Sequence, residues 1–151
     1  MAKIPPELQK LEDILRSSKM VSHGFMGTDS RFFQDVIDAD LAELLKLKTT
    51  AAQIAARMQQ ITDIAIPALG NWVDIDQTRQ ASVEEAKGLL ICPWPHNANF
   101  AKRITTVKLK NSPRTIRWSD LNIHLIAEHN FFEGKGSPFR LEPQELIKMI
   151  F

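Results

Sequence analysis

The chain of 151 residues has a single cysteine, Cys92, and no long apolar run. One cysteine excludes a framework of intrachain disulfide bonds, which fits a reducing compartment. No stretch approaches the roughly twenty apolar residues that a membrane-spanning helix needs. The charged segment from Met1 to Arg16 also lacks the apolar core of a signal peptide. These absences predict a cytoplasmic protein without a membrane partner.

Acidic residues are missing from one long segment of the chain. Between Lys87 and Trp118 there are seven basic residues and no Asp or Glu, although the net charge of the whole chain is only +1. The positive charge is therefore local, and a binding partner encounters local charge rather than the average. The length and the ordinary composition predict one globular domain, residues 1–151.

The first half of the chain has the apolar spacing of helices, with three or four residues between successive apolar positions. Capping residues and prolines mark where these helices begin and end. The predicted helices run from Pro6 to Ser17, from Asp29 as a cap through Ile37, from Ala39 to Leu47, and from Thr49 or Thr50 as a cap to Pro67.

Two of these helices have the outline of a helix-turn-helix over residues 41–58. In that interpretation Thr50, Gln53 and Arg57 would face a DNA groove. A recognition helix normally lies in a positive field, whereas residues 29–86 are net acidic. An antiparallel helical hairpin is therefore the preferred interpretation.

From Trp72 onward the apolar residues alternate with polar ones, which is typical of strands. A loop from Lys110 to Pro113 places Val107 opposite Ile116 in a β-hairpin. The segment from Gln80 to Lys87 fits either a helix start or an edge strand. The other predicted strands are Trp72–Asp76, Leu89–Cys92 as a buried central strand, and Ile104–Lys110.

Two helices complete the pattern. Ser119 can cap a helix from Asp120 to about Asn130, and Pro143 begins a helix that reaches about Ile150. The fold class that follows is α+β: N-terminal helices, a small and mainly antiparallel sheet with a β-hairpin in the C-terminal half, and two C-terminal helices.

Residues that bind metals or transfer protons are concentrated in this half: Cys92, His96, His124 and His129. Zinc favours four such nitrogen or sulfur ligands. Pro93 and Pro95 favour extended backbone before them, and an extended segment would separate the Cα atoms of Cys92 and His96 by about 12 Å. Cys92 is therefore discounted as a ligand that shares an ion with His96, and a buried, inert thiol is expected.

His124 and Glu128 form the stronger pair by spacing, because four residues place them on one helix face. His129 diverges from His124 by roughly 140° around a continuous helix. Two hypotheses follow. His124 and Glu128 could be a helix-surface hydrogen-bonded pair, or a metal-dependent enzyme could bind a divalent metal through His96, His124, Glu128 and, as a further ligand, His129.

The basic segment suggests an anionic partner, either a small ligand or a nucleic acid. The candidate ligand-binding residues are Lys102, Arg103, Lys108, Lys110, Arg117, Lys135 and Arg140. Asp74 and Asp76 alternate on one strand as the lysines do on theirs, so adjacent strands could neutralise the basic face. Arg140 is expected to pair with a carboxylate.

A non-enzymatic module that binds an anionic partner through the basic β-hairpin is the leading functional hypothesis. The metal-dependent enzyme is the first alternative. A structural protein or a homodimer, sealed by aromatic residues on a sheet edge, is the second.

Overall fold

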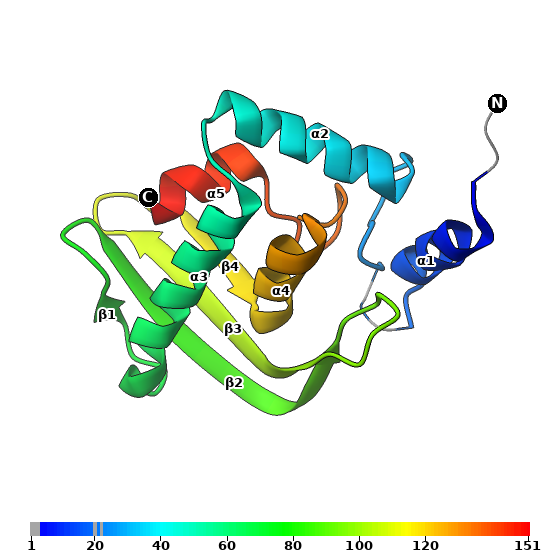
Figure 1. Cartoon of the computed structure of the whole chain (residues 1–151). Helices are drawn as coiled ribbons and strands as arrows, with labels where there is room; N and C mark the ends of the chain where they lie inside the picture. Colours follow the sequence, from blue (N-terminus) through cyan, green and yellow to red (C-terminus); the bar gives the residue numbers. More distant parts are fainter. Residues whose placement is uncertain (1–3, 20, 22) are drawn as a thin grey trace.

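The strands of the protein form a four-stranded antiparallel sheet in the order β1-β2-β3-β4, in a computed structural model that describes residues 4–19, 21 and 23–151. Helices precede and follow the strands along the chain (Figure 1), which confirms the predicted α+β class. The elements are α1 Pro6–Arg16, α2 Phe33–Lys46, α3 Ala51–Ala65, the short 3-10 helix η1 Ile66–Ala68, β1 Val73–Asp74, β2 Arg79–Ile91, β3 Asn99–Leu109, β4 Thr115–Ser119, α4 Asp120–His129 and α5 Pro143–Ile150.

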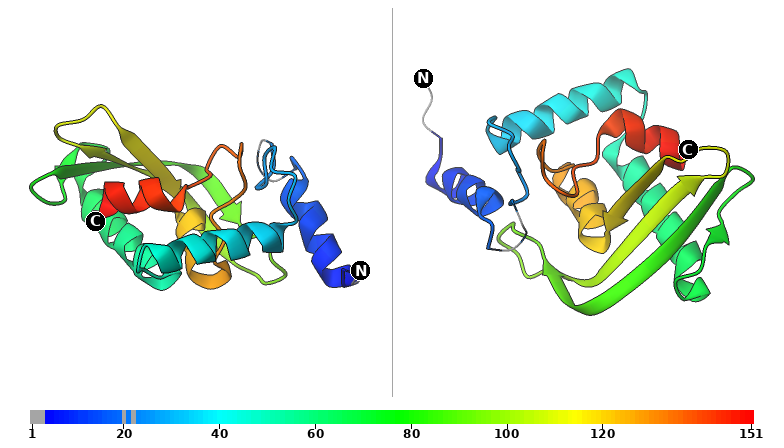
Figure 2. Two further views of the ribbon diagram at one scale, coloured as in Figure 1. Left: turned by 90° about the horizontal axis from the view of Figure 1, so that it is seen from above. Right: turned by 180° about the vertical axis from the view of Figure 1, so that it is seen from behind.

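Helices α3, α4 and α5 cover one face of the sheet, while α1 stands apart beside the end of the β2–β3 hairpin (Figures 1 and 2). A larger apolar core fills the space between α3, α4, α5 and the sheet. A second core joins α1, α2 and α4 to the hairpin end and contains Cys92. Each helix in the described part of the chain is too short or too polar to span a bilayer.

Local sequence signals set several helix ends where they were predicted. Thr50 and Gln53 form a reciprocal capping box at the start of α3. Ser119 and Asn122 do the same for α4. Pro143 begins α5, where its missing amide hydrogen has no helical partner to lose.

The predicted break within residues 33–46 is wrong, because α2 is one continuous helix. No proline or glycine lies in this range to end a helix, and Val36, Ile37 and Leu44 continue one buried face. The expected cap is also wrong. The side chain of Asp29 pairs with Arg31 and does not cap α2. The carboxylate of Glu12 in α1 accepts a hydrogen bond from the amide of Phe33, which has no partner within the helix.

The ambiguous segment at Gln80–Lys87 belongs to the long strand β2. The pairing of β2 with β3 shifts between Glu85 and Leu89, where Gly88 has a φ of 107°. This irregularity bends the hairpin and directs its end toward α1 and α4 (Figure 1). The predicted burial of Leu89–Cys92 is wrong for Leu89 and Ile91, which are 63% and 53% exposed, because β1 pairs with only the first part of β2.

The register of the second hairpin is confirmed. Val107 lies opposite Ile116, and Thr106 lies opposite Arg117. Val107 is fully buried in the larger core, so a shift by one residue would expose it to solvent.

Candidate metal centre

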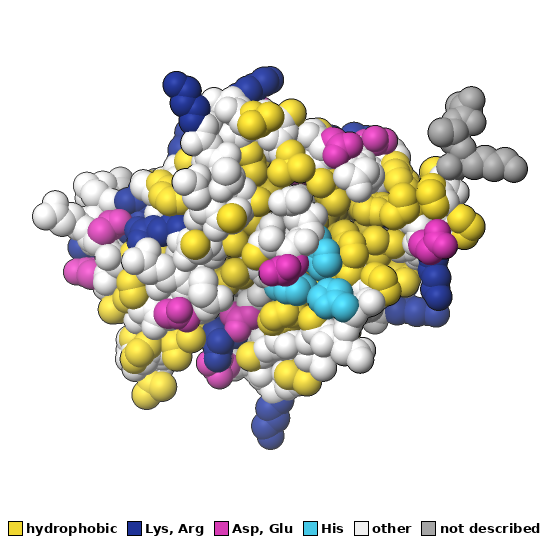
Figure 3. All heavy atoms as spheres, in the orientation of Figure 1, with side chains coloured by type: hydrophobic (Ala, Val, Ile, Leu, Met, Phe, Trp, Pro, Cys, Tyr) yellow, Lys and Arg dark blue, Asp and Glu magenta, His cyan; other side chains and the backbone are white. Residues whose placement is uncertain are grey.

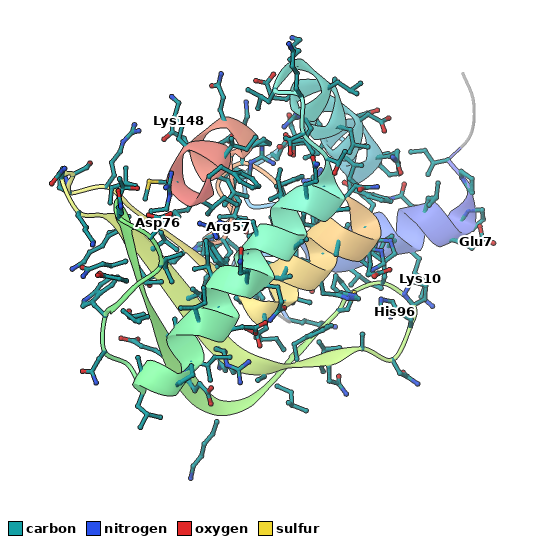
Figure 4. All side chains as sticks on the ribbon, turned by 60° about the vertical axis from the view of Figure 1, so that its left-hand side comes forward. Glu7, Lys10, Arg57, Asp76, His96 and Lys148 are labelled. Carbon is teal, nitrogen blue, oxygen red and sulfur yellow. The ribbon has the colours of Figure 1, made fainter. Side chains whose placement is uncertain are left out.

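Four side chains that can bind a metal converge at the end of the β2–β3 hairpin. They are Cys92 and His96 from the loop between the strands, and His124 and His129 from α4. One ligand atom from each residue lies within 4.8 Å of every other. Histidine side chains gather on this face of the molecule among hydrophobic side chains (Figure 3), and His96 lies at the hairpin end (Figure 4).

Four of the six separations between the ligand atoms are close to the edges of a tetrahedron around one zinc ion, and all six are 4.8 Å or less. With zinc bonds of about 2.0 to 2.1 Å to nitrogen and about 2.3 Å to sulfur, tetrahedral geometry separates two nitrogens by about 3.3 Å and nitrogen from sulfur by about 3.6 Å. The Nε2 atom of His96 lies 3.1 Å from that of His129 and 3.3 Å from that of His124. The Sγ atom of Cys92 lies 3.1 Å from the Nε2 atom of His96 and 3.5 Å from that of His129.

Hydrogen bonding within the cluster cannot satisfy these four atoms together. The Nε2 atom of His96 contacts three other ligand atoms, but a neutral imidazole nitrogen offers either one proton or one lone pair. It can therefore form one well-directed hydrogen bond, and at least two of its three contacts have no hydrogen bond of their own. A cation at the centre would accept a lone pair from every member of the cluster.

The loop between Cys92 and Ala98 is compact, and the prediction that Cys92 and His96 are too far apart is wrong. The amide of His96 donates to the carbonyl of Trp94 across Pro95, at 2.7 Å. The amide of Ala98 donates to the carbonyl of His96 in the same way, at 3.0 Å. Such three-residue turns reverse the chain with trans peptide bonds, and the described backbone has no cis bond.

The amide of Cys92 donates to the carbonyl of Ala98, which closes the loop next to the strand pair Ile91 and Asn99. The sequence does contain a signal for this hairpin, namely a short segment with proline and asparagine between two strand-like segments. Interpreting that segment as a hairpin loop predicts that its two ends lie close together. The prolines bend the chain within the loop rather than extending it throughout.

Helix α4 contributes both His124 and His129 to the cluster, and the helix ends at His129. His129 is the last helical residue, and Asn130 adopts the left-handed conformation with φ of 54°. The two imidazoles reach His96 from positions five residues apart, with ring centroids 5.2 Å from each other. The angular divergence between these positions thus does not exclude His129 from the cluster.

Glu128 lies outside the cluster, contrary to the predicted set of ligands. Its side chain is exposed, and its position was expected to be partly buried beside Leu121 and Leu125. Those leucines pack in the second core, while Glu128 points to solvent. Its negative charge still acts on His124 by raising the pKa of that imidazole, against a larger lowering effect of burial.

Aromatic rings orient two of the histidines. The ring of Trp94 stacks on His129 with a centroid distance of 4.1 Å and an interplanar angle of 11°. Phe33 and Phe131 meet the same indole at its edges. Phe100 packs against His124 at 4.6 Å. The contacts of Trp94 and Phe100 with the ligand side chains could not be predicted from the sequence.

Burial favours the uncharged, metal-binding form of the two imidazoles from α4, those of His124 and His129. It lowers the pKa of His129 to about 4, and repulsion from His124 and His96 acts in the same direction. The pKa of His124 is also lowered, mainly by burial. Burial raises the pKa of the Cys92 thiol, so metal binding there would release a proton.

Carboxylates pair with several of the predicted anion-binding residues. Arg103 bridges Glu85 at 2.8 Å and Asp120 at 2.7 Å. Lys110 lies 3.2 Å from Asp74, as one of the predicted neutralising pairs. Asp76 instead pairs with Arg57 and Arg79.

Arg140 is buried between Asp40 and Glu142, as the pairing prediction required. Two other basic residues lie over aromatic rings: Lys108 over Trp72 at 4.0 Å, and Arg117 over Phe139 at 4.8 Å. Lys102 and Lys135 have no ion pair among the described residues. The predicted basic residues thus do not form one continuous uncompensated patch.

The residues proposed to face a DNA groove have other roles. Thr50 and Gln53 cap α3. Arg57 donates to the carbonyl of Ile150 and lies 3.3 Å from Asp76, between α3 and the sheet (Figure 4). Helix α3 packs mainly against α4 and β2 rather than along α2, so the predicted antiparallel hairpin of these two helices is wrong as well.

Family models, curated proteins and solved structures give no match to this chain. Function is therefore inferred from the geometry of the cluster.

Proposed function

We propose that this protein binds one zinc ion through Cys92, His96, His124 and His129, and that the ion joins the β2–β3 loop to α4. The observation that carries the proposal is the set of ligand separations, 3.1 to 3.5 Å for four of the pairs. One thiolate and three imidazoles form a donor set that suits zinc. Protein donors fill all four tetrahedral positions, which is typical of a structural site.

The ion would add direct bonds between the β2–β3 loop and α4 to the packing of Cys92 and Trp94 in the second core. The loop between Cys92 and Ala98 extends beyond the sheet, and its residue His96 is exposed. A metal bond from each end of this loop to α4 would hold the second core closed. This role explains why the ligands come from two segments that are distant in the sequence.

Elemental analysis of untagged protein tests the proposal. We expect about one zinc per chain, and cobalt substitution should give the visible spectrum of a tetrahedral site with a thiolate ligand. Cys92→Ala and His124→Ala should each remove stoichiometric binding. Absence of metal after purification, together with no uptake on addition of zinc or cobalt, would refute it.

Two control variants come from the same chain. Glu128→Gln changes the neighbour of His124 that lies outside the cluster and should leave zinc stoichiometry unchanged. His23→Asn changes an exposed histidine in the left-handed conformation, which asparagine tolerates. Equal loss of zinc in Glu128→Gln and His124→Ala would contradict the ligand set.

Anion binding by the β3–β4 face is a second proposal. Lys108 and Arg117 share this face, because Arg117 lies opposite Thr106 and Lys108 is two residues along the same strand. Both charges lie over aromatic rings rather than beside carboxylates. Binding of single-stranded oligonucleotides across a salt series tests it, and absence of binding at low salt would remove nucleic acid as the partner.

A homodimer is a third proposal. Trp72, Leu89 and Ile91 expose apolar surface on or beside the sheet. Sedimentation over a range of protein concentrations tests it, and a single monomer species at the highest concentration would argue against self-association.

A further inference from the structure

A cavity of about 520 Å³ lies apart from the histidine cluster. Its walls are the β2–β3 ribbon, the start of α4 and the loop between α4 and α5. A cavity of this volume is large enough for a small organic ligand. The apolar residues that line it include Phe25, Leu90, Ile104, Leu121 and Phe139.

One wall of the cavity contains a hydrogen-bonded polar network. The Glu133 carboxylate accepts hydrogen bonds from the Asn122 side-chain amide and from the Ser137 hydroxyl, each at 2.6 Å. The Ser119 hydroxyl donates to Asn122 at 3.0 Å and extends the network. Ser119, Glu133 and Ser137 line the cavity, so the polar network borders an otherwise apolar space.

The backbone at Glu133 is held in an unusual conformation. Its φ is 66°, in the left-handed region that a residue with a long side chain rarely adopts. The next amide, of Gly134, donates to the carbonyl of Phe25, and Arg140 donates to the carbonyl of Glu133 itself. These contacts fix the strained backbone and hence the position of the carboxyl group.

No basic side chain in the described part of the chain forms an ion pair with the Glu133 carboxylate. The guanidinium of Arg140 is the nearest candidate, but it pairs with Asp40 and Glu142. Glu133 is only 4% exposed, so its carboxyl group has little contact with bulk solvent. Burial raises the pKa of Glu133 to about 7.

The charges at the cavity rim also favour a cation. Glu84 and Glu85 line the cavity, and Lys102 is the basic residue that lines it. Arg103 neutralises Glu85, which leaves Glu84, Lys102 and Glu133 without an ion pair among the described residues. A ligand with one positive charge would complement this arrangement, while its apolar part would contact the cavity walls.

We propose that the cavity binds a small apolar molecule with a protonated primary amine, and that the Glu133 carboxylate binds the ammonium group. Ammonium groups donate up to three hydrogen bonds, and the two oxygens of Glu133 retain lone pairs beyond those used by Asn122 and Ser137. Binding transfers a proton from neutral Glu133 to solvent and leaves an ion pair. The site is independent of the proposed zinc ion.

Calorimetry with three matched compounds tests this site: n-octylamine, n-octanol and n-octanoate. We expect only the amine to bind with an affinity that rises as the pH passes from below to above about 7, the pKa of Glu133. The other charges that face Glu133 are those of Arg140, Lys102, Glu84 and Glu85. Buffers with different ionisation enthalpies should report release of about half a proton at pH 7.

Variants separate the roles of the carboxylates. Glu133→Gln should weaken amine binding roughly tenfold to a hundredfold and abolish proton release, because a charge-assisted hydrogen bond is lost. Glu7→Gln, which changes an exposed carboxylate of α1 outside the cavity, is the matched control and should change the affinity by less than about threefold. Zinc content should be unchanged in both.

A measurement on the unchanged protein covers the case in which Glu133→Gln does not fold. NMR of the isotope-labelled Glu133 carboxyl should show its pKa falling when n-octylamine is added. The proposal is overturned if octanol or octanoate binds as tightly as the amine, if none of the three binds, or if the Glu133 carboxyl does not respond to the amine.

Discussion

Two groups of polar side chains are enclosed by this fold, and they differ in whether the protein alone satisfies them. Under α3, the indole of Trp118 donates to Thr62 at 3.0 Å, and the hydroxyls of Thr62 and Thr105 lie 2.6 Å apart. All three side chains are fully buried, and each has a partner. At the hairpin end, four ligand atoms surround one point and cannot all be hydrogen-bonded to each other.

The difference shows how a structural polar group can be distinguished from a candidate binding site. A buried polar group that is fully paired lowers the free energy of the fold without a ligand. A cluster whose close contacts cannot all be hydrogen bonds is instead a candidate for binding another species, such as a metal ion. The predictions below test this distinction, beginning with the largest effect.

Metal removal should have the largest effect. At a free zinc concentration a thousand times its dissociation constant, binding contributes about 4 kcal/mol to the free energy of unfolding. A chelator should therefore lower the unfolding midpoint of the protein but not that of Cys92→Ala. Urea denaturation with and without chelator measures this. If the unchanged protein had the same midpoint with and without chelator, the cluster would need no metal for stability, like the fully paired polar groups under α3.

Glu133 should make stability dependent on pH. Its pKa rises from 4.5 to about 7 on folding because of burial, so the folded protein retains a proton that the unfolded chain has released. The associated stability is fully present below about pH 4.5 and is lost as the pH rises through about 7. The loss is up to about 3 kcal/mol. Glu133→Gln should flatten the stability profile in this interval, and an unchanged slope in that variant would assign the pH effect to other groups.

Thr62→Val should destabilise the self-satisfied network without affecting metal binding. The variant keeps the shape of the side chain but leaves the indole of Trp118 and the hydroxyl of Thr105 without a partner. We expect a loss of about 2 kcal/mol in the free energy of unfolding and an unchanged zinc content. Thr62→Ser, which keeps the hydroxyl, is the control. If Thr62→Val were as stable as the original protein, this hydrogen-bond network would be dispensable for stability.

Trp94→Leu should have the smallest effect. Leucine keeps apolar contact with Phe33 and Phe131 but removes the ring that stacks on His129. The stacking is worth about 1 kcal/mol, so zinc affinity should fall roughly fivefold to tenfold while the stoichiometry stays at one. Competition with a metal indicator measures the affinity. An affinity equal to that of the original protein would show that the ring does not orient the ligand.

Features that depend on neighbouring residues were predicted well. The caps at Thr50 and Ser119, the start of α5 at Pro143 and the pairing of Val107 with Ile116 all follow from short-range sequence signals. Each of these signals acts over a few residues, because the hydrogen bonds involved connect positions close in the sequence.

Features that depend on distant contacts were predicted less well. The cap of α2 comes from Glu12, twenty-one residues earlier in the chain than the amide it accepts. Cys92 was discounted as a ligand because a local extended geometry was assumed, and Glu128 was preferred because of its helical spacing alone. Neither argument included the closing of the hairpin loop.

The sequence by itself determined the fold class, most of the helices, the second hairpin and the presence of a cysteine and three histidines in one half of the chain. Only the tertiary structure decided that these four residues meet at one point, while Glu128 lies in solvent and Glu133 lines a separate cavity. The reason is physical. Hydrogen bonds within helices, hairpins and the loop at Pro95 are local, whereas the packing of Trp94 against His129 exists only after the hairpin has folded against α4.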